Sequence, residues 1–373
     1  MANNLDAVIP VMYRALDTVS RELAGFIPAV SRDSNAENAA KGQTIKSPVV
    51  PSIEPSDIEP GVTGNQGHMS VDTVDMQITK AQSAKVTWTG EDQLGVSHSE
   101  QLERIQEDRF VQAMRSLVNR VEADLAAEYT RASRAYGDGG VTPFDGGIRE
   151  LSEIKKIMLD NGAPQDEDFH LVLNTEAGAN LRSLEKLTNV HQAGTDDVLR
   201  RGELGRLYGF GVRESAQIAS HSAGSGSDLS VSGSHSSGAT EISVSGDASG
   251  LKIGDVVEIG DHKYVVEDGT GDKLKIRAPG LMESVSGDTS ISVEGGYSAN
   301  LAFHRSAIHL ITRAPAMPDG GDGGDDVTEI TDPDTGLAFQ VAVYRQYRQI
   351  TYEIGLAWGT RAVKPEHAAL LLG

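Results

Sequence analysis

The fold is decided by residues 97–136, which read SHSEQLERIQEDRFVQAMRSLVNRVEADLAAEYTRASRAY. This stretch contains no Gly and no Pro, although the chain has 41 Gly and 13 Pro in all. Its apolar residues recur at steps of three and four, the period of one helical face, at Phe110, Met114, Leu117, Val118, Val121, Leu125 and Tyr129. One helix of that length would extend about 60 Å. The pattern predicts a long strut that presents large surfaces to neighbouring molecules.

Both ends of the stretch carry signals of helix termination. Ser97, followed three residues later by Glu100, fits a capping box. Arg131 and Arg134 lie where the negative end of the helix dipole favours cations, and Gly137 is a typical helix stop. We therefore predict that helical structure begins at Ser97 and ends before Gly137.

The apolar spacing has one irregular step. From Ile105 to Phe110 it is five residues, which predicts a break or kink near Glu107–Arg109. We expect a short helix followed by one of about seven turns. The alternative is an exposed coiled-coil seam, which the spacing favours less because it does not sustain clean heptads.

Composition restricts the class of protein. The 373 residues have room for about two or three compact units, and 38% hydrophobic residues suffice for their cores. A net charge of −21 argues against a protein that grips nucleic acid by charge, because phosphate binding needs a basic surface. The absence of Cys excludes disulfides and thiolate metal sites. We expect no membrane span and no signal peptide, because no apolar run is long enough and the N-terminus lacks a basic region.

The N-terminal residues 4–30 predict an amphipathic helical arm. Its apolar face comprises Leu5, Val8, Ile9, Met12, Leu16, Val19, Leu23 and Phe26. Such a face needs a partner surface, which either a neighbouring subunit or the same chain can supply. We predict inter-subunit contacts at Leu5, Val8, Met12 and Leu16.

Residues 43–95 predict a long protruding hairpin. Strand patterns at 44–50 and 71–89 flank a tip rich in Pro, Gly and acidic residues. A hairpin that projects alone is marginal in water, so its natural partner is another molecule. The alternative is an edge hairpin that folds back on its own domain. We predict further inter-subunit contacts in the tip, at Pro51, Ile53, Pro55, Ile58, Pro60 and Val62.

The remaining chain divides by composition. Residues 148–219 predict a compact α/β unit with helices at 148–159 and 175–187, the second capped by Thr175, and a strand at 169–173. Residues 220–297 are rich in Ser and Gly and predict a small all-β barrel with strands at 229–231, 241–244, 256–259, 263–266, 273–277 and 290–293. Residues 298–373 predict strands at 307–313, 341–347 and 349–358.

Catalytic motifs are missing from the sequence. It contains no nucleophile elbow, phosphate loop, dinucleotide fingerprint or paired-His zinc motif, so we expect no enzyme and no cofactor. His304 and His309 are predicted on opposite faces of one strand, where they could not share a metal. One acidic loop fits a calcium nonapeptide pattern once, with Asp322, Asp325 and Asp326 as weak oxygen-ligand candidates. The pattern lacks a second copy, which favours a solvated loop.

The order of these pieces resembles the major capsid proteins of tailed phages and related archaeal viruses. The likeness lies in Asn174 after the strand 169–173, in the turn 205–212, in the late strand 303–313 and in the closing segment 347–367. The barrel, with LKIGDV at 251–256, resembles an insertion seen in coat proteins of short-tailed phages. The loop 318–336 has no counterpart in the resemblance.

The resemblance implies an α+β fold of the Hong Kong-97 type, divided as N-terminal arm 1–42, extended loop hairpin 43–95, spine helix and peripheral domain 96–147, axial domain 148–219, inserted β-barrel 220–297, and a second axial and peripheral part 298–373. It implies pentamers and hexamers in an icosahedral virion head around double-stranded DNA that is contacted non-specifically. The resemblance also implies a scaffolding protein and a portal protein as partners, and a possible decoration protein. It implies assembly in the host cytoplasm without contact with a membrane. The alternatives are a bacterial nanocompartment shell, a β-domain surface adhesin and a hydrolase.

Overall fold

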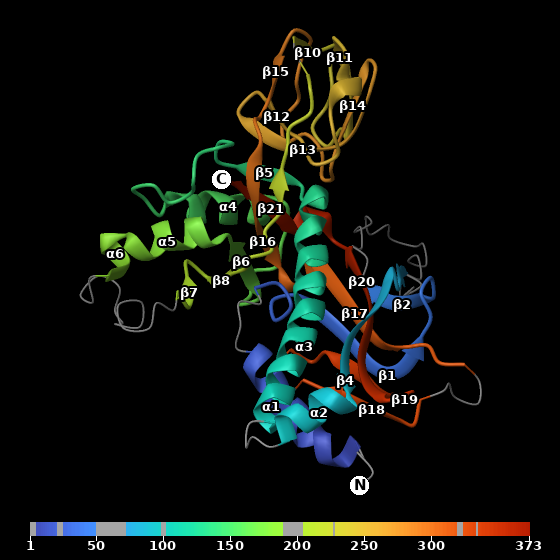
Figure 1. The fold of residues 1–373 in the computed structure, drawn as a ribbon. Helices are drawn as coiled ribbons and strands as arrows, with labels where there is room; N and C mark the ends of the chain where they lie inside the picture. The colour runs from blue at the N-terminus through green and yellow to red at the C-terminus, as the bar shows by residue number, and fades with distance from the viewer. Residues whose placement is uncertain are drawn as a thin grey trace, which may run out of the picture.

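The computed structural model describes residues 5–20, 25–49, 72–97, 102–188, 204–226, 228–318, 324–332 and 335–373. Its central element is the helix α3, Leu102–Ala126, which runs along the molecule between a mixed sheet and a ring of short strands (Figure 1). Its 25 residues make about seven turns, as predicted. The predicted break at Glu107–Arg109 is wrong, because α3 is continuous there and the short helix α2, Gly90–Ser97, precedes it instead.

The helix also ends earlier than its sequence suggests. After Ala126 the chain forms a 3-10 turn, η1 at Ala127–Arg131, and then the strand β5, Arg134–Tyr136. β5 pairs with strands from two distant parts of the chain, which outweighs the local helical preference. Ser97 ends α2, and residues 98–101 of the predicted capping box lie outside the described residues.

A six-stranded sheet forms one half of the molecule. Its order is β1-β17-β20-β19-β18, with β4 also paired to β20. The strands are β1 Ser31–Ala39, β4 Lys80–Thr89, β17 Ile308–Pro315, β18 Asp326–Thr331, β19 Ala338–Gln346 and β20 Gln349–Ala362. The predicted strands at 307–313, 341–347 and 349–358 are confirmed. β1 was not predicted, since its sequence SRDSNAENA has no apolar alternation, and it forms through parallel pairing with β17.

Two helices pack on this sheet. α1, Leu5–Ser20, lies against α3, and α3 lies against β4 and β20. Phe110 of α3 meets Tyr352 of β20 edge to face, and Trp358 donates its indole N–H to Asp124 at 2.8 Å. These contacts belong to the largest hydrophobic core of the subunit.

The hairpin predicted at 43–95 has its base in the structure. β2, Thr44–Val49, pairs antiparallel with β3, Asp72–Gln77, and no third strand joins them in the described part of the chain. Met76 and Ile78 pack on Ile311 and Ala357 of the six-stranded sheet in a small separate core. The predicted tip lies outside the described residues.

The second sheet contains the α/β unit. Its strands are ordered β13-β5-β21-β16-β6-β8-β7, and α4 packs against β21 and β5. Its further elements are α4 Arg149–Asp160, β6 Phe169–Leu173, α5 Thr175–Ser183, α6 Glu185–Thr188, β7 Arg206–Leu207, β8 Phe210–Glu214, β9 Ser220–His221, β16 Tyr297–His304, η3 Arg305–Ala307, η4 Pro365–His367 and β21 Ala368–Leu372. The predicted helix 175–187 is divided at Leu184. Its cap is Asn174 rather than Thr175, because the Asn174 side chain accepts the Ala177 N–H at 2.8 Å.

Six short strands close into a ring beyond one end of α3 (Figure 1). All six match the strands predicted between 229 and 293, and they surround a hydrophobic core of their own. They are β10 Leu229–Val231, β11 Glu241–Ser245, β12 Val256–Ile259, β13 His262–Thr270, β14 Lys273–Ile276 and β15 Ser290–Val293, with the turn η2 at Ala248–Gly250. The chain leaves for the ring at His221 and returns at Tyr297, and these two residues are paired neighbours in the sheet.

Candidate functional site

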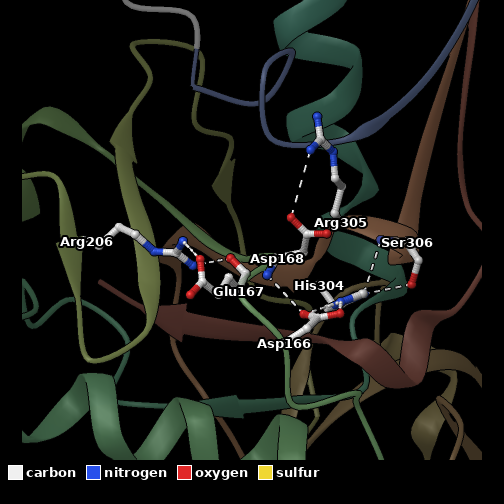
Figure 2. A network of polar contacts seen from close by, with 7 residues as sticks. All are labelled: Asp166, Glu167, Asp168, Arg206, His304, Arg305 and Ser306. Carbon is white, nitrogen blue, oxygen red and sulfur yellow. Dashed lines mark hydrogen bonds and ion pairs between the residues drawn. The ribbon is translucent and has the colours of Figure 1, made fainter.

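The polar cluster between β6 and β16 has the composition of a catalytic triad. His304, at the end of β16, places Nε2 2.9 Å from an Asp166 carboxylate oxygen and Nδ1 2.8 Å from the Ser306 hydroxyl (Figure 2). Asp166 precedes β6, and Ser306 lies in the 3-10 turn that follows β16. A serine, a histidine and an aspartate in this order are the groups that nucleophilic hydrolases use.

The local geometry gives the triad a structural role instead. The Ser306 backbone N–H donates to His304 Nδ1, so this nitrogen caps the turn η3 and Nε2 carries the proton that is donated to Asp166. Four pockets described in this part of the chain have none of these three side chains in their linings. The pKa of Asp166 is lowered, first by the Asp168 N–H and then by His304. The cluster fastens the loop before β6 to the end of β16.

The predicted placement of the two histidines is wrong. His304 ends β16, and His309 lies in β17 beyond the intervening turn η3, so they do not belong to one strand. No group of three metal-ligating side chains occurs among the described residues.

A group of arginines surrounds His170 beside this cluster. Burial and then the charges of Arg213, Arg305 and Arg206 lower the pKa of His170 to about 4. Both ring nitrogens are buried without a hydrogen-bond partner. Arg206 pairs with Glu167 at 3.0 Å, and Arg305 lies 3.9 Å from Asp168 (Figure 2). His170 is therefore held neutral in a positive environment.

Replacing His170 by Phe should make the subunit less sensitive to acid. The unfolded histidine titrates near pH 6.5 and the folded one near 4, so its stabilising effect is complete above pH 6.5 and is lost as the pH falls towards 4. After solvent screening we expect the loss to be about 1–2 kcal/mol. Urea unfolding at pH 8 and pH 4.5 measures it. Equal losses in the parent and in His170→Phe would contradict this assignment.

Glu122 in α3 is the most heavily engaged buried acid described. It is 1% exposed, and it accepts the backbone N–H groups of Gly25 at 3.2 Å, Phe26 at 3.0 Å and Ile27 at 2.7 Å. The Ser215 hydroxyl donates to it as well, at 3.0 Å. Burial raises the pKa of Glu122, while these donors act in the opposite direction. One carboxylate thus holds residues 25–27 against α3. The predicted helix 4–30 is wrong in this part, because α1 ends at Ser20 and residues 25–30 are not helical.

A second buried network joins the ring to α3. The Tyr129 hydroxyl lies 2.8 Å from His221 Nδ1, and His221 Nε2 lies 2.7 Å from Asp255. Asp255 also accepts the backbone N–H groups of Gly224 and Lys252. The Asp255 carboxylate fixes both β9, through His221, and the ring loop that contains Lys252. It thereby orients the ring relative to η1, the turn that follows α3.

Sequence reasoning missed both networks. Glu122 is one acidic residue among several on α3, and its donors lie 95 to 97 residues away along the chain. The one local signal was its spacing, because Glu122 lies four residues after Val118 and three before Leu125, which both belong to the apolar face.

The predicted contact residues have different outcomes. Met12 and Leu16 are 0% and 1% exposed in the core that includes α3, so the chain itself supplies their partner surface and these two are packing residues of the subunit. The side chains of Leu5 and Val8 lie outside the described residues, as do the tip residues Pro51, Ile53, Pro55, Ile58, Pro60 and Val62.

Of the three predicted calcium ligands, the structure describes Asp325 and Asp326. Asp322 lies outside the described residues. Asp325 forms an ion pair with Arg345 at 3.1 Å, and Asp326 begins β18. A carboxylate already paired with a guanidinium is a poor ligand for calcium. No helix among the described residues is long and apolar enough to cross a membrane.

Comparison with known proteins finds likeness in structure alone. No protein-family model matches the chain, and no curated protein does either. A structure from Mycobacterium phage Che8 is 14% identical over 89% of this chain and 85% of that one, with a TM-score of 0.45. The capsid of cyanophage P-SCSP1u is 10% identical over 94% and 88%, with a TM-score of 0.49. The virus-like particle from Pyrococcus furiosus is 10% identical over 96% and 97%, with a TM-score of 0.41.

These identities are at most 14%, and each TM-score lies below 0.5. Over most of its length the chain is similar in structure to capsid proteins of phages.

Proposed function

We propose that the chain is the shell-forming major capsid protein of a tailed virus, with a Hong Kong-97-type fold and an inserted β-barrel at 220–297. Its copies assemble as pentamers and hexamers around double-stranded DNA, with a scaffolding protein and a portal protein as partners. The role is structural and not enzymatic. The virion is where the assembled protein resides.

The observation that carries the proposal is the construction of the subunit. A single long helix links a large sheet at one end to a closed ring of strands at the other (Figure 1). The hairpin β2–β3 is anchored at its base on the six-stranded sheet, and no third strand pairs with it in the described ranges. Two strands alone are marginally stable in water, so a hairpin of this kind gains from packing on another molecule.

The exposed aromatic Tyr347 supports the same conclusion. It lies at the turn between β19 and β20 and is 90% exposed. Aromatic side chains are enriched in protein interfaces because they bury a large area with few rotatable bonds. The His304 side chain caps the turn η3 and binds Asp166, which is a structural role.

Electron microscopy of the purified full chain tests the proposal. We expect closed polyhedral particles, and nucleic acid within those isolated from an infected host. Solitary subunits under all assembly conditions would overturn the proposal. Particles that enclose a protein cargo in place of nucleic acid would favour a nanocompartment.

Deleting residues 51–68 should separate folding from assembly. β2 and β3 remain paired up to Val49 and Asp72, so a short turn can rejoin them and circular dichroism should match that of the parent. We expect the yield of closed particles to fall at least tenfold, because the hairpin loses its reach towards a neighbour. Normal particles from this variant would remove the hairpin from the assembly contacts.

A further inference from the structure

A groove at the edge of the second sheet is rich in arginine. It has a volume of about 480 Å³ and lies along β8 and the end of α5, where Arg182, Arg206 and Arg213 line it. Arg182 pairs with Glu214 at 2.6 Å, and Arg206 pairs with the exposed Glu167. Arg213 forms no ion pair with any described residue. We call this surface the arginine groove.

Further positive charge lies behind the groove. Burial and then the charge of Arg305 lower the pKa of Arg213, Glu122 acts in the opposite direction, and Arg32 lowers it further. In a chain whose net charge is −21 such a concentration is unusual. The surface therefore fits an anionic partner.

An acidic counterpart lies on the same sheet. A pocket of about 680 Å³ is bounded by α4, β5 and the turn between β12 and β13. Seven acidic side chains line it against three basic ones, Arg134, Lys156 and Lys263. Of the acidic ones, Asp145, Asp160 and Asp261 are exposed and form no salt bridge within the described ranges. One carboxylate oxygen of Glu150, also in the lining, is buried without a partner. We call this surface the acidic pocket.

The two surfaces lie at opposite margins of one stretch of sheet. In the strand order, β5 at the acidic pocket and β8 at the arginine groove are separated by β21, β16 and β6, which is about 19 Å at the usual strand spacing. Complementary surfaces at two different places on a subunit join copies head to tail. Such contacts repeat around an axis and generate rings when the rotation closes.

We propose that the arginine groove of one copy docks on the acidic pocket of the next copy of the same chain. This inference rests on the proposed shell function and identifies the contact that builds its rings. The partner is a second copy because the chain itself carries both members of the charge pair, and Arg213 in the groove and Asp145, Asp160 and Asp261 in the pocket form no ion pair with any described residue.

Charge exchange in two separate chains tests the docking. One variant carries Arg206→Glu and Arg213→Glu, and the other carries Asp145→Arg and Asp261→Arg. We expect each alone to assemble at least tenfold less than the parent, because its groove and pocket repel. Mixed together they should form rings with an even number of subunits again, such as hexamers, because the two variants alternate: Glu faces Arg at one interface, and the unchanged groove meets the unchanged pocket at the next. Sedimentation velocity and electron microscopy measure both.

A matched control carries Arg104→Glu and Arg120→Glu on exposed positions of α3, with the same change in net charge. It should assemble like the parent. If the groove variant assembles normally while the parent forms particles, the docking is wrong and the shell function stands. If assembly is lost, the mixture gives no rings and the groove variant no longer binds double-stranded DNA, the partner of the groove is nucleic acid and the inference fails. If the parent never assembles, the proposed function itself fails.

Discussion

Replacing Glu122 by Ala is expected to release the N-terminal segment from the subunit and to destabilise it strongly. The change leaves three backbone N–H groups, those of Gly25, Phe26 and Ile27, and the Ser215 hydroxyl without their acceptor in a buried site. Buried donors without partners cost about 1–3 kcal/mol each, and water entering the vacated space recovers part of this cost. We expect the free energy of unfolding to fall by about 4 kcal/mol.

Two measurements check this expectation. Urea unfolding gives the loss of stability, and limited proteolysis should show new cleavage between α1 and β1, because that segment loses its anchor. Asp108→Asn, at an exposed position of the same helix, is the matched control and should change neither. A Glu122→Ala variant as stable and as protease-resistant as the control would show that the carboxylate does not hold the segment.

Excising residues 222–296 and closing the gap with a short linker should leave the rest of the subunit folded. His221 and Tyr297 are paired neighbours, so the two cut ends already lie side by side. The ring has its own core, and its removal leaves all strands of the six-stranded sheet paired as before. This is the behaviour expected of an inserted domain.

The excision carries a defined cost. It removes the Asp255 partner of His221 and the β13 strand that pairs with Arg134 and Ala135 of β5. We expect a loss of a few kcal/mol, on the order of one or two buried side chains, rather than unfolding. Thermal melts followed by circular dichroism measure it. Loss of the cooperative transition would show that the ring belongs to the core of the subunit and is not an insertion.

The ring strands and the helix α3 are the elements that local sequence patterns predicted best. All six ring strands were predicted because each combines alternation over a few residues with a Gly or Asp turn close by, so the information is local. The length of α3 followed from its apolar period for the same reason. Its early end did not, because β5 forms only when β13 and β21 lie beside it. The helix cap was predicted one residue too late, at Thr175 instead of Asn174. Both residues have a side chain that can cap a helix, and the extended backbone angles of Asn174 decide which of them does so.

By itself, the sequence determined the apolar period of α3, the six short strands of the ring, the acidic charge and the lack of catalytic motifs. Only the tertiary structure decided which polar groups meet: Glu122 with amides some 95 residues away, His304 with Asp166, and the arginines of three elements in one groove. Periodicity is carried by neighbouring residues and can be read along the chain. A hydrogen bond or a charge pair between distant segments depends on the path of the chain between them, which no local pattern contains.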